Sequence, residues 1–151
     1  MMSHFDGLLN DTLPLLQVDF TAEGALADLE NPPNTGGFEL VGTLVQPNAK
    51  IHMTHIWITP FNRHLHWVSE HVHDYDEVLI WTGNDPENPQ DLGAELYIDI
   101  EGERRIINKS GSIYIPAGVR HCPLGFHYVN RPFLFHALSL DPEYKAKVQK
   151  S

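Results

Sequence analysis

From Phe38 onward, short apolar runs alternate with clusters of Gly, Pro, Asn and Asp. The runs are rich in Val, Ile, Trp and Tyr, the residues that favour β-strands. They are FELVGTLV (38–45), IHMTHIWIT (51–59), HLHWVS (64–69), DEVLIWT (76–82), AELYIDI (94–100), ERRIIN (103–108), SIYIPA (112–117) and RPFLFHALSL (131–140). About eight short strands separated by turns predict an all-β domain, a two-sheet sandwich or jelly roll.

The two ends of the chain have a different pattern. Residues 1–37 are predicted to be an N-terminal arm, in which TAEGALADLE (21–30) has the pattern of a short helix and NPPNTGG (31–37) ends it. Residues 141–151 are predicted to form a short C-terminal helix, because Asp141 can cap it and Pro142 suits the first helical position. No repeat or linker divides the remainder, so residues 38–140 are predicted to be one β-barrel domain.

Length and charge narrow the choice of partners. With 151 residues, 42% of them hydrophobic, the chain can form one domain with an ordinary core. Ten Lys and Arg against twenty Asp and Glu give a formal net charge of −10. This balance argues against nucleic acid and against an anionic membrane surface, since both attract basic proteins. A small-molecule ligand remains compatible with it.

Cysteine content and hydropathy indicate the compartment. Cys122 is the only cysteine, so the chain has no intrachain disulfide, which favours a reducing compartment. No segment approaches the roughly 20 apolar residues of a membrane span. The first residues, MMSHFDGLLND, have no basic region followed by a long apolar run, unlike a secretory signal. We therefore expect a cytoplasmic protein.

Histidine is the residue type that points to chemistry. The chain has ten histidines, and several occur in closely spaced pairs. In HVHDYDE (71–77), His71 and His73 lie two residues apart, so on a strand they point to the same face. The next three residues are enough for a tight hairpin, after which Glu77 opens an antiparallel strand and pairing places it beside the two histidines.

A fourth candidate ligand follows about forty residues later. In PAGVRH (116–121), Pro116 and Gly118 form a turn that can swing His121 inward. Three imidazoles and one carboxylate make a nitrogen and oxygen donor set that suits Fe, Mn, Co, Ni, Cu or Zn. The sequence therefore predicts one divalent transition metal held by these four side chains.

These two segments resemble the two motifs of the cupin family. HVHDYDE followed by Gly83 is similar to the first motif, and GSIYIPAGVRH (111–121) to the second. The resemblance covers about residues 38–140 and implies a double-stranded β-helix. It also implies a metal bound by His71, His73, Glu77 and His121, and a homodimer, since small cupins commonly dimerise. Leu65 and Gly125 replace a glycine and an asparagine that the motifs usually contain.

Other residues are candidates for a supporting role around the metal. His55 and His136 lie on predicted strands, where either can face the barrel interior and act as an acid or base beside the metal, or face outward. Strand alternation alone leaves the two faces undistinguished. Tyr75 lies between the predicted ligands in the sequence and can overhang the site. Trp81 is predicted to lie on the same face of its strand as Glu77, so it can form a wall of a substrate pocket.

The ligand set allows two classes of function. The leading hypothesis is a metalloenzyme that acts on a small organic molecule chelated by the metal, with oxygenase, isomerase, decarboxylase or lyase chemistry. The competing hypothesis is a non-enzymatic module that binds a small ligand and uses the metal structurally. Coordination positions left open toward a pocket favour the enzyme, whereas closed coordination favours a structural metal.

Overall fold

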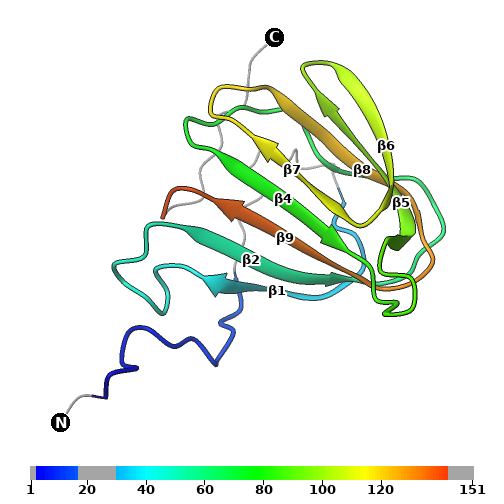
Figure 1. Ribbon diagram of the computed structural model, residues 1–151. Coiled ribbons are helices and arrows are strands. Elements are labelled where there is room, and N and C mark those ends of the chain that lie inside the picture. Colours follow the sequence, from blue (N-terminus) through cyan, green and yellow to red (C-terminus); the bar gives the residue numbers. More distant parts are fainter. Residues whose placement is uncertain (1–2, 17–29, 143–151) are drawn as a thin grey trace.

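The computed structural model describes residues 3–16 and 30–142, and the strands within residues 34–139 form a barrel of two antiparallel sheets (Figure 1). The strands are β1 (Asn34–Val41), β2 (His52–Ile58), β3 (Leu65–Val68), β4 (Glu77–Thr82), β5 (Asp91–Ile100), β6 (Glu103–Lys109), β7 (Gly111–Ile115), β8 (His121–Val129) and β9 (Phe133–Ser139). One sheet has the order β1-β2-β9-β4-β7 and the other β3-β8-β5-β6. This confirms the predicted all-β jelly-roll fold.

The segments outside the barrel are only partly described. The predicted helix over residues 21–30 lies outside the described residues except for Glu30, and so does the predicted C-terminal helix after Pro142. The first strand starts at Asn34, inside the segment predicted to end the arm, and it stops at Val41, where the chain turns. Leu15 forms a single bridge to Phe38, which ties the arm to the edge strand β1.

Strand β8 has no counterpart among the predicted strands, because Pro123 and Gly125 interrupt its apolar pattern. Proline is normally excluded from a central strand, since it cannot donate a ladder hydrogen bond. Here β8 lies between β3 and β5, and its register changes at the proline. Leu124 is opposite Ile98 and His121 is opposite Ile100, so two residues of β8 face one residue of β5. This bulge accommodates the proline.

The hydrophobic core lies between the two sheets. Along β4 the buried residues Glu77, Leu79 and Trp81 alternate with half-buried ones, so one face of the strand points into the barrel. Phe126 on β8 and Phe133 on β9 are fully buried and belong to the same core. At the start of β4 the buried residue is the polar Glu77, whereas Leu79 and Trp81 further along the strand belong to the hydrophobic core.

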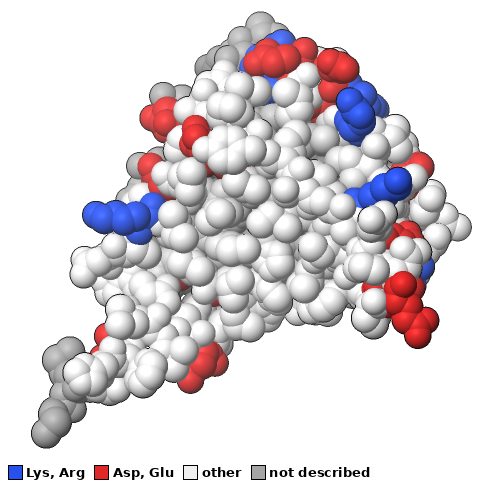
Figure 2. All heavy atoms as spheres, viewed as in Figure 1, with Lys and Arg blue, Asp and Glu red and all other residues white. Residues whose placement is uncertain are grey.

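The outer face of the five-stranded sheet is apolar at its centre. Met53 pairs with Leu138, and Trp57 pairs with Leu134, on the side of β2 and β9 that points away from the core. In Figure 2 this face shows Lys, Arg, Asp and Glu mainly around its rim. Within the described residues no helix is long and apolar enough to cross a membrane.

Candidate metal centre

The four predicted ligands come together where the chain crosses between the sheets. His71 and His73 lie between β3, in the four-stranded sheet, and β4, in the five-stranded sheet. His71 pairs through its backbone with His121 at the start of β8, with N–O distances of 3.0 and 3.1 Å. The predicted hairpin between the HVH segment and β4 is therefore wrong, because β4 pairs with β7 and β9 instead.

The ligand atoms of the three histidines lie within 4.8 Å of one another. Glu77 is the first residue of β4, and its Oε1 lies 3.4 Å from Nε2 of His73 and 3.6 Å from Nε2 of His121. All four residues are at most 3% exposed. The structure thus brings together in one buried cluster the four residues that the sequence predicted as ligands.

The backbone fixes how each imidazole is presented. The Nδ1 atoms of His71, His73 and His121 donate to the carbonyl oxygens of Ser69, Tyr75 and Val119, at 2.8, 2.8 and 2.9 Å. With the proton on Nδ1, the lone pair of a neutral ring is on Nε2. Each Nε2 is therefore oriented toward the centre of the cluster in the form that binds a metal.

Several polar atoms of the cluster have no hydrogen-bond partner within the protein, which also fits a metal site. Nε2 of each of the three histidines and Oε2 of Glu77 are buried without a hydrogen-bond partner. Buried polar atoms are normally paired, because leaving one unpaired costs roughly 1–3 kcal/mol. Several such atoms converging on one point indicate that a ligand from outside the chain satisfies them. A divalent transition metal suits three imidazole nitrogens and a carboxylate.

The electrostatics of the cluster favour the metal-binding forms of His71 and Glu77. Burial and, after it, the neighbouring His121 lower the pKa of His71 to about 4. Burial opposes ionisation of Glu77, but the adjacent imidazoles of His121 and His73 outweigh it and lower the pKa of Glu77 to about 2. Burial also opposes protonation of His73, yet the Glu77 carboxylate raises the pKa of His73. Near neutral pH, Glu77 is charged and His71 is neutral, as ligands must be.

The lowered pKa of His71 predicts a pH dependence of stability. In the unfolded chain His71 titrates near 6.5, whereas in the folded protein it titrates near 4. Between these values the unfolded state binds more protons, so stability falls as the pH falls through that window. For metal-free protein, the loss from His71 between pH 7.5 and pH 5 is about 2 kcal/mol.

This pH dependence can be measured by urea unfolding of chelator-treated protein at the two pH values. We expect the metal-free His71→Gln variant to lose about 2 kcal/mol less than the wild type on acidification. The comparison with the variant removes the opposite contribution of His73, which both proteins share. An equal loss in both proteins would contradict the assignment of a buried, neutral His71.

Tyr75 and Trp81, the two predicted pocket residues, lie in different surroundings. The ring of Tyr75 stacks on the ring of His73, with centroids 4.2 Å apart and planes within 4°. Tyr75 thus contacts His73, a candidate ligand, through its ring and through its backbone carbonyl. Trp81 lies in the packed core about 13 Å along β4 from Glu77, and its Nε1 donates to the carbonyl of Lys109 at 2.9 Å. Trp81 is therefore not a wall of the metal site.

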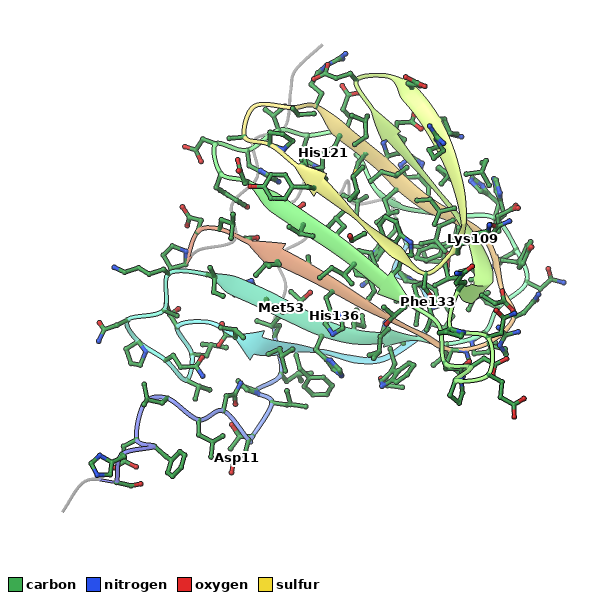
Figure 3. The ribbon with its side chains drawn as sticks, viewed as in Figure 1. Asp11, Met53, Lys109, His121, Phe133 and His136 are labelled. Carbon is green, nitrogen blue, oxygen red and sulfur yellow. The ribbon has the colours of Figure 1, made fainter. Side chains whose placement is uncertain are left out.

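His55 and His136 do not lie beside the candidate metal site; of the two orientations that the sequence left open, the structure shows the outward one, so their candidate role as an acid or base beside the metal is wrong. His136 pairs with Ile80, which alternates with the inward-facing residues of β4, so His136 points outward. Nδ1 of His55 lies 3.1 Å from Nε2 of His136, which places both on the outer face of the five-stranded sheet. Figure 3 shows His136 midway along β9 and His121 at the start of β8.

Interior polar residues that the sequence pattern did not reveal lie on β1, β2 and β9. They are Glu39, His52 and Ser139, all buried. Nε2 of His52 lies 3.5 Å from Oε1 of Glu39. The spacing of His52 from Ile56 and Ile58 places all three on one face of β2. Met53 and Trp57 lie on the other face, which is therefore apolar too. The alternation therefore gave no clear indication that His52 points inward.

Comparison with known proteins supports the fold. No family model matches the sequence, and a search of curated proteins found no match. The crystal structure of DMSP lyase DddQ from Ruegeria pomeroyi DSS-3 superposes with a TM-score of 0.55 and 18% identity over 88% of this chain. A structure of the DMSP lyases RdDddP and RnDddQII gives 0.50 and 13% over 76%. This chain spans 59% and 52% of those chains.

The two-sheet barrel is a double-stranded β-helix, the fold that the resemblance of the two sequence motifs to those of the cupins implies. At these identities the likeness extends to the fold alone. Function is therefore inferred from the buried cluster of this chain, because one fold carries many reactions.

Proposed function

We propose that this chain is a metal-dependent enzyme that acts on a small organic molecule chelated by its metal. His71, His73 and His121 hold the metal, with Glu77 as the fourth ligand. The observation that carries the proposal is the set of three buried Nε2 atoms, each without a partner and each aimed at one point by a backbone bond at Nδ1.

The residues around the cluster set the conditions for chemistry. When bound, a divalent transition metal supplies Lewis-acid polarisation of a substrate oxygen or, with iron, reaction with dioxygen. A six-coordinate metal held by these four side chains would have two positions left for a bidentate substrate. Tyr75 covers the His73 ring, and Ile115 pairs with Glu77 on β7. Both are buried and keep bulk water from the ligands.

The proposal predicts the metal content and the activity of protein purified without a histidine tag. We expect about one equivalent of transition metal per chain, since the site offers one cluster. Elemental analysis measures this directly, and the metal it identifies selects the assays. Iron directs oxygen-uptake screening, while zinc, nickel, cobalt or manganese directs screens for isomerisation, decarboxylation and elimination of small organic acids.

The control for the metal analysis and the activity screens is His55→Ala, a variant that removes an imidazole from the outer face of the same barrel. This variant should retain the metal and the activity of the wild type. If metal-loaded protein turned over nothing in both screens, the enzymatic proposal would be abandoned. A protein that took up no metal after reconstitution would also remove the proposed site.

A further inference from the structure

The interior of the five-stranded sheet changes from apolar to polar toward the metal centre. Successive rows across β4, β9 and β2 follow from the pairing of these strands. The rows are Trp81, Phe135 and Ile56; then Leu79 and Ala137; then Glu77, Ser139 and His52. The last row is polar on all three strands. It begins at a proposed metal ligand and runs sideways across the barrel interior.

This row is buried, which makes its polarity unusual. Ser139 is 0% exposed, and its hydroxyl oxygen has no hydrogen-bond partner. In the neighbouring position of the row, Oε2 of Glu77 is also buried without a partner. Interior polar atoms are nearly always paired, so a group that the chain does not supply is expected to meet them. The metal accounts for Glu77, but it leaves the Ser139 hydroxyl unexplained.

A carboxylate fixed by the backbone supports the far end of the row. Oε1 of Glu39 lies 3.5 Å from Nε2 of His52, and Oε2 accepts a hydrogen bond from the backbone N–H of Leu44 at 3.0 Å. Gly42 passes so close to this carboxylate that an added Cβ would overlap with it. Glu39 is thus enclosed by its own turn, and it orients the ring of His52.

The length of the row matches a small molecule. Adjacent strands lie about 4.8 Å apart, so Ser139 is about 5 Å and His52 about 10 Å across the sheet from Glu77, measured along the backbone. A molecule whose oxygen lies at the metal therefore needs about three or four carbon atoms to reach the Ser139 hydroxyl and the His52 side chain.

We infer that Ser139 and His52, with His52 positioned by Glu39, form a second half of the substrate site that binds a hydroxyl group, so that the substrates are small hydroxy acids. This inference rests on the proposed function, because the acid end of such a molecule is placed at the metal. The hydroxyl end lies at the polar row, where Ser139 and His52 exchange hydrogen bonds with it.

The charges of the row favour a hydroxyl over other groups. Burial lowers the pKa of His52, although the Glu39 carboxylate opposes this, so the ring is neutral at neutral pH. A second carboxylate would be repelled by Glu39 without compensation from a charged imidazole. An ammonium group would lack an accessible counter-charge, since both oxygens of Glu39 are already engaged. A hydroxyl both donates and accepts, and so it suits Ser139 and His52.

Cobalt-loaded protein provides the test, because the visible spectrum of Co²⁺ reports binding at the metal independently of activity. The probes are two matched series: propionate, 3-hydroxypropionate, 3-aminopropionate and malonate; and butyrate, 4-hydroxybutyrate, 4-aminobutyrate and succinate. In at least one series, we expect the hydroxy acid to bind at least tenfold more tightly than each of its three analogues. Ser139→Ala should reduce this preference at least fivefold, and so should His52→Leu.

The variants have matched controls. His55→Gln changes the outward-facing histidine of the same strand and should leave the preference unchanged. Cobalt content should be the same in all four proteins, since Ser139 and His52 are not ligands. Ser139→Ala removes a single oxygen atom, so it decides the test if His52→Leu does not fold.

The outcomes separate this inference from the proposed function. Cobalt binding with equal affinities for hydroxy and unsubstituted acids would overturn the inference alone. The inference is also overturned if an amino acid or dicarboxylate binds most tightly, if none of the acids binds, or if the preference survives in both variants. Failure of the wild type to bind cobalt would contradict the proposed function and, with it, this inference.

Discussion

Replacing His121 with alanine is expected to lower the metal affinity of the protein at least about 100-fold. Disrupting even an outer partner of a metal ligand typically costs about 10- to 100-fold, and this change removes a ligand itself. In the wild type, a hydrogen bond from Nδ1 to the carbonyl oxygen of Val119 orients the His121 ring, and the backbone of His121 pairs with that of His71. Alanine preserves that pairing, so the expected effect is on the metal and not on the strand.

The effect appears in two measurements that together exclude unfolding. Calorimetric titration of chelator-treated protein with Zn²⁺ or Co²⁺ gives the affinity. Thermal or urea unfolding with added metal gives the stabilisation. At a free metal concentration 100 times the dissociation constant of the wild type, metal binding stabilises the wild type by about 2.7 kcal/mol, and a variant bound 100-fold more weakly by about 0.4 kcal/mol.

The control for this experiment is again an outward-facing histidine. His55→Ala should bind the metal as the wild type does, because His55 contacts His136 on the other side of the sheet. A His121→Ala protein with wild-type affinity would show that His121 is not a ligand. An equal loss of affinity in His55→Ala would show that the effect is not local to the cluster.

The second large effect is expected from Gly83→Ala, which should lower the free energy of unfolding by about 2–4 kcal/mol. Gly83 follows β4, and a Cβ at this position would overlap with the carbonyl oxygen of Asp91. The Cβ would also lie 3.2 Å from Cα of Leu92, which is fully buried. Both obstacles are backbone atoms at the start of β5, which cannot move aside as the end of a side chain can.

Urea or thermal unfolding of metal-free protein measures this change without a contribution from the metal. Gly37→Ala is the matched control, since a Cβ there meets no heavy atom within 4 Å and the backbone is not left-handed. We expect it to alter stability by no more than about 0.5 kcal/mol. If Gly83→Ala were as mild as this control, the close approach of the two chain segments would not be a constraint.

Much of the site could be predicted because its residues lie in short, ordered segments. HVHDYDE and PAGVRH supply all four clustered side chains, and the turn around Gly118 does bring His121 to His71. The hairpin predicted between His73 and Glu77 was wrong because sequence spacing gives the separation of two residues and not their sheet partners. The residues between them cross from one sheet to the other, and β4 pairs with strands that come much later in the chain.

The orientation of β2 and β9 could not be predicted from the sequence, since apolar residues lie on both faces of each strand. On β9, Leu134 and Leu138 point outward and Phe133 and Phe135 inward. Period-two alternation identifies the interior face only when the other face is polar. This is why His55 and His136 were candidates for the interior and His52 was not.

Strand β8 was missed for a different reason. A proline in a central strand contradicts the usual preference, and only the bulge opposite Ile98 and Ile100 makes it acceptable. That bulge depends on pairing between segments far apart in the sequence. The local sequence pattern therefore predicted the class of fold and the four residues that cluster, whereas strand pairing decided which other polar residues lie in the interior.

The most direct test of the metal centre is the X-ray absorption spectrum of tag-free protein loaded with one equivalent of Co²⁺. The predicted result is a first shell of nitrogen and oxygen atoms only, at about 2.0–2.2 Å, with the multiple scattering of three imidazole rings. A spectrum of the hydrated ion without imidazole scattering, or a shell that contains sulfur, would contradict a centre built from His71, His73, Glu77 and His121.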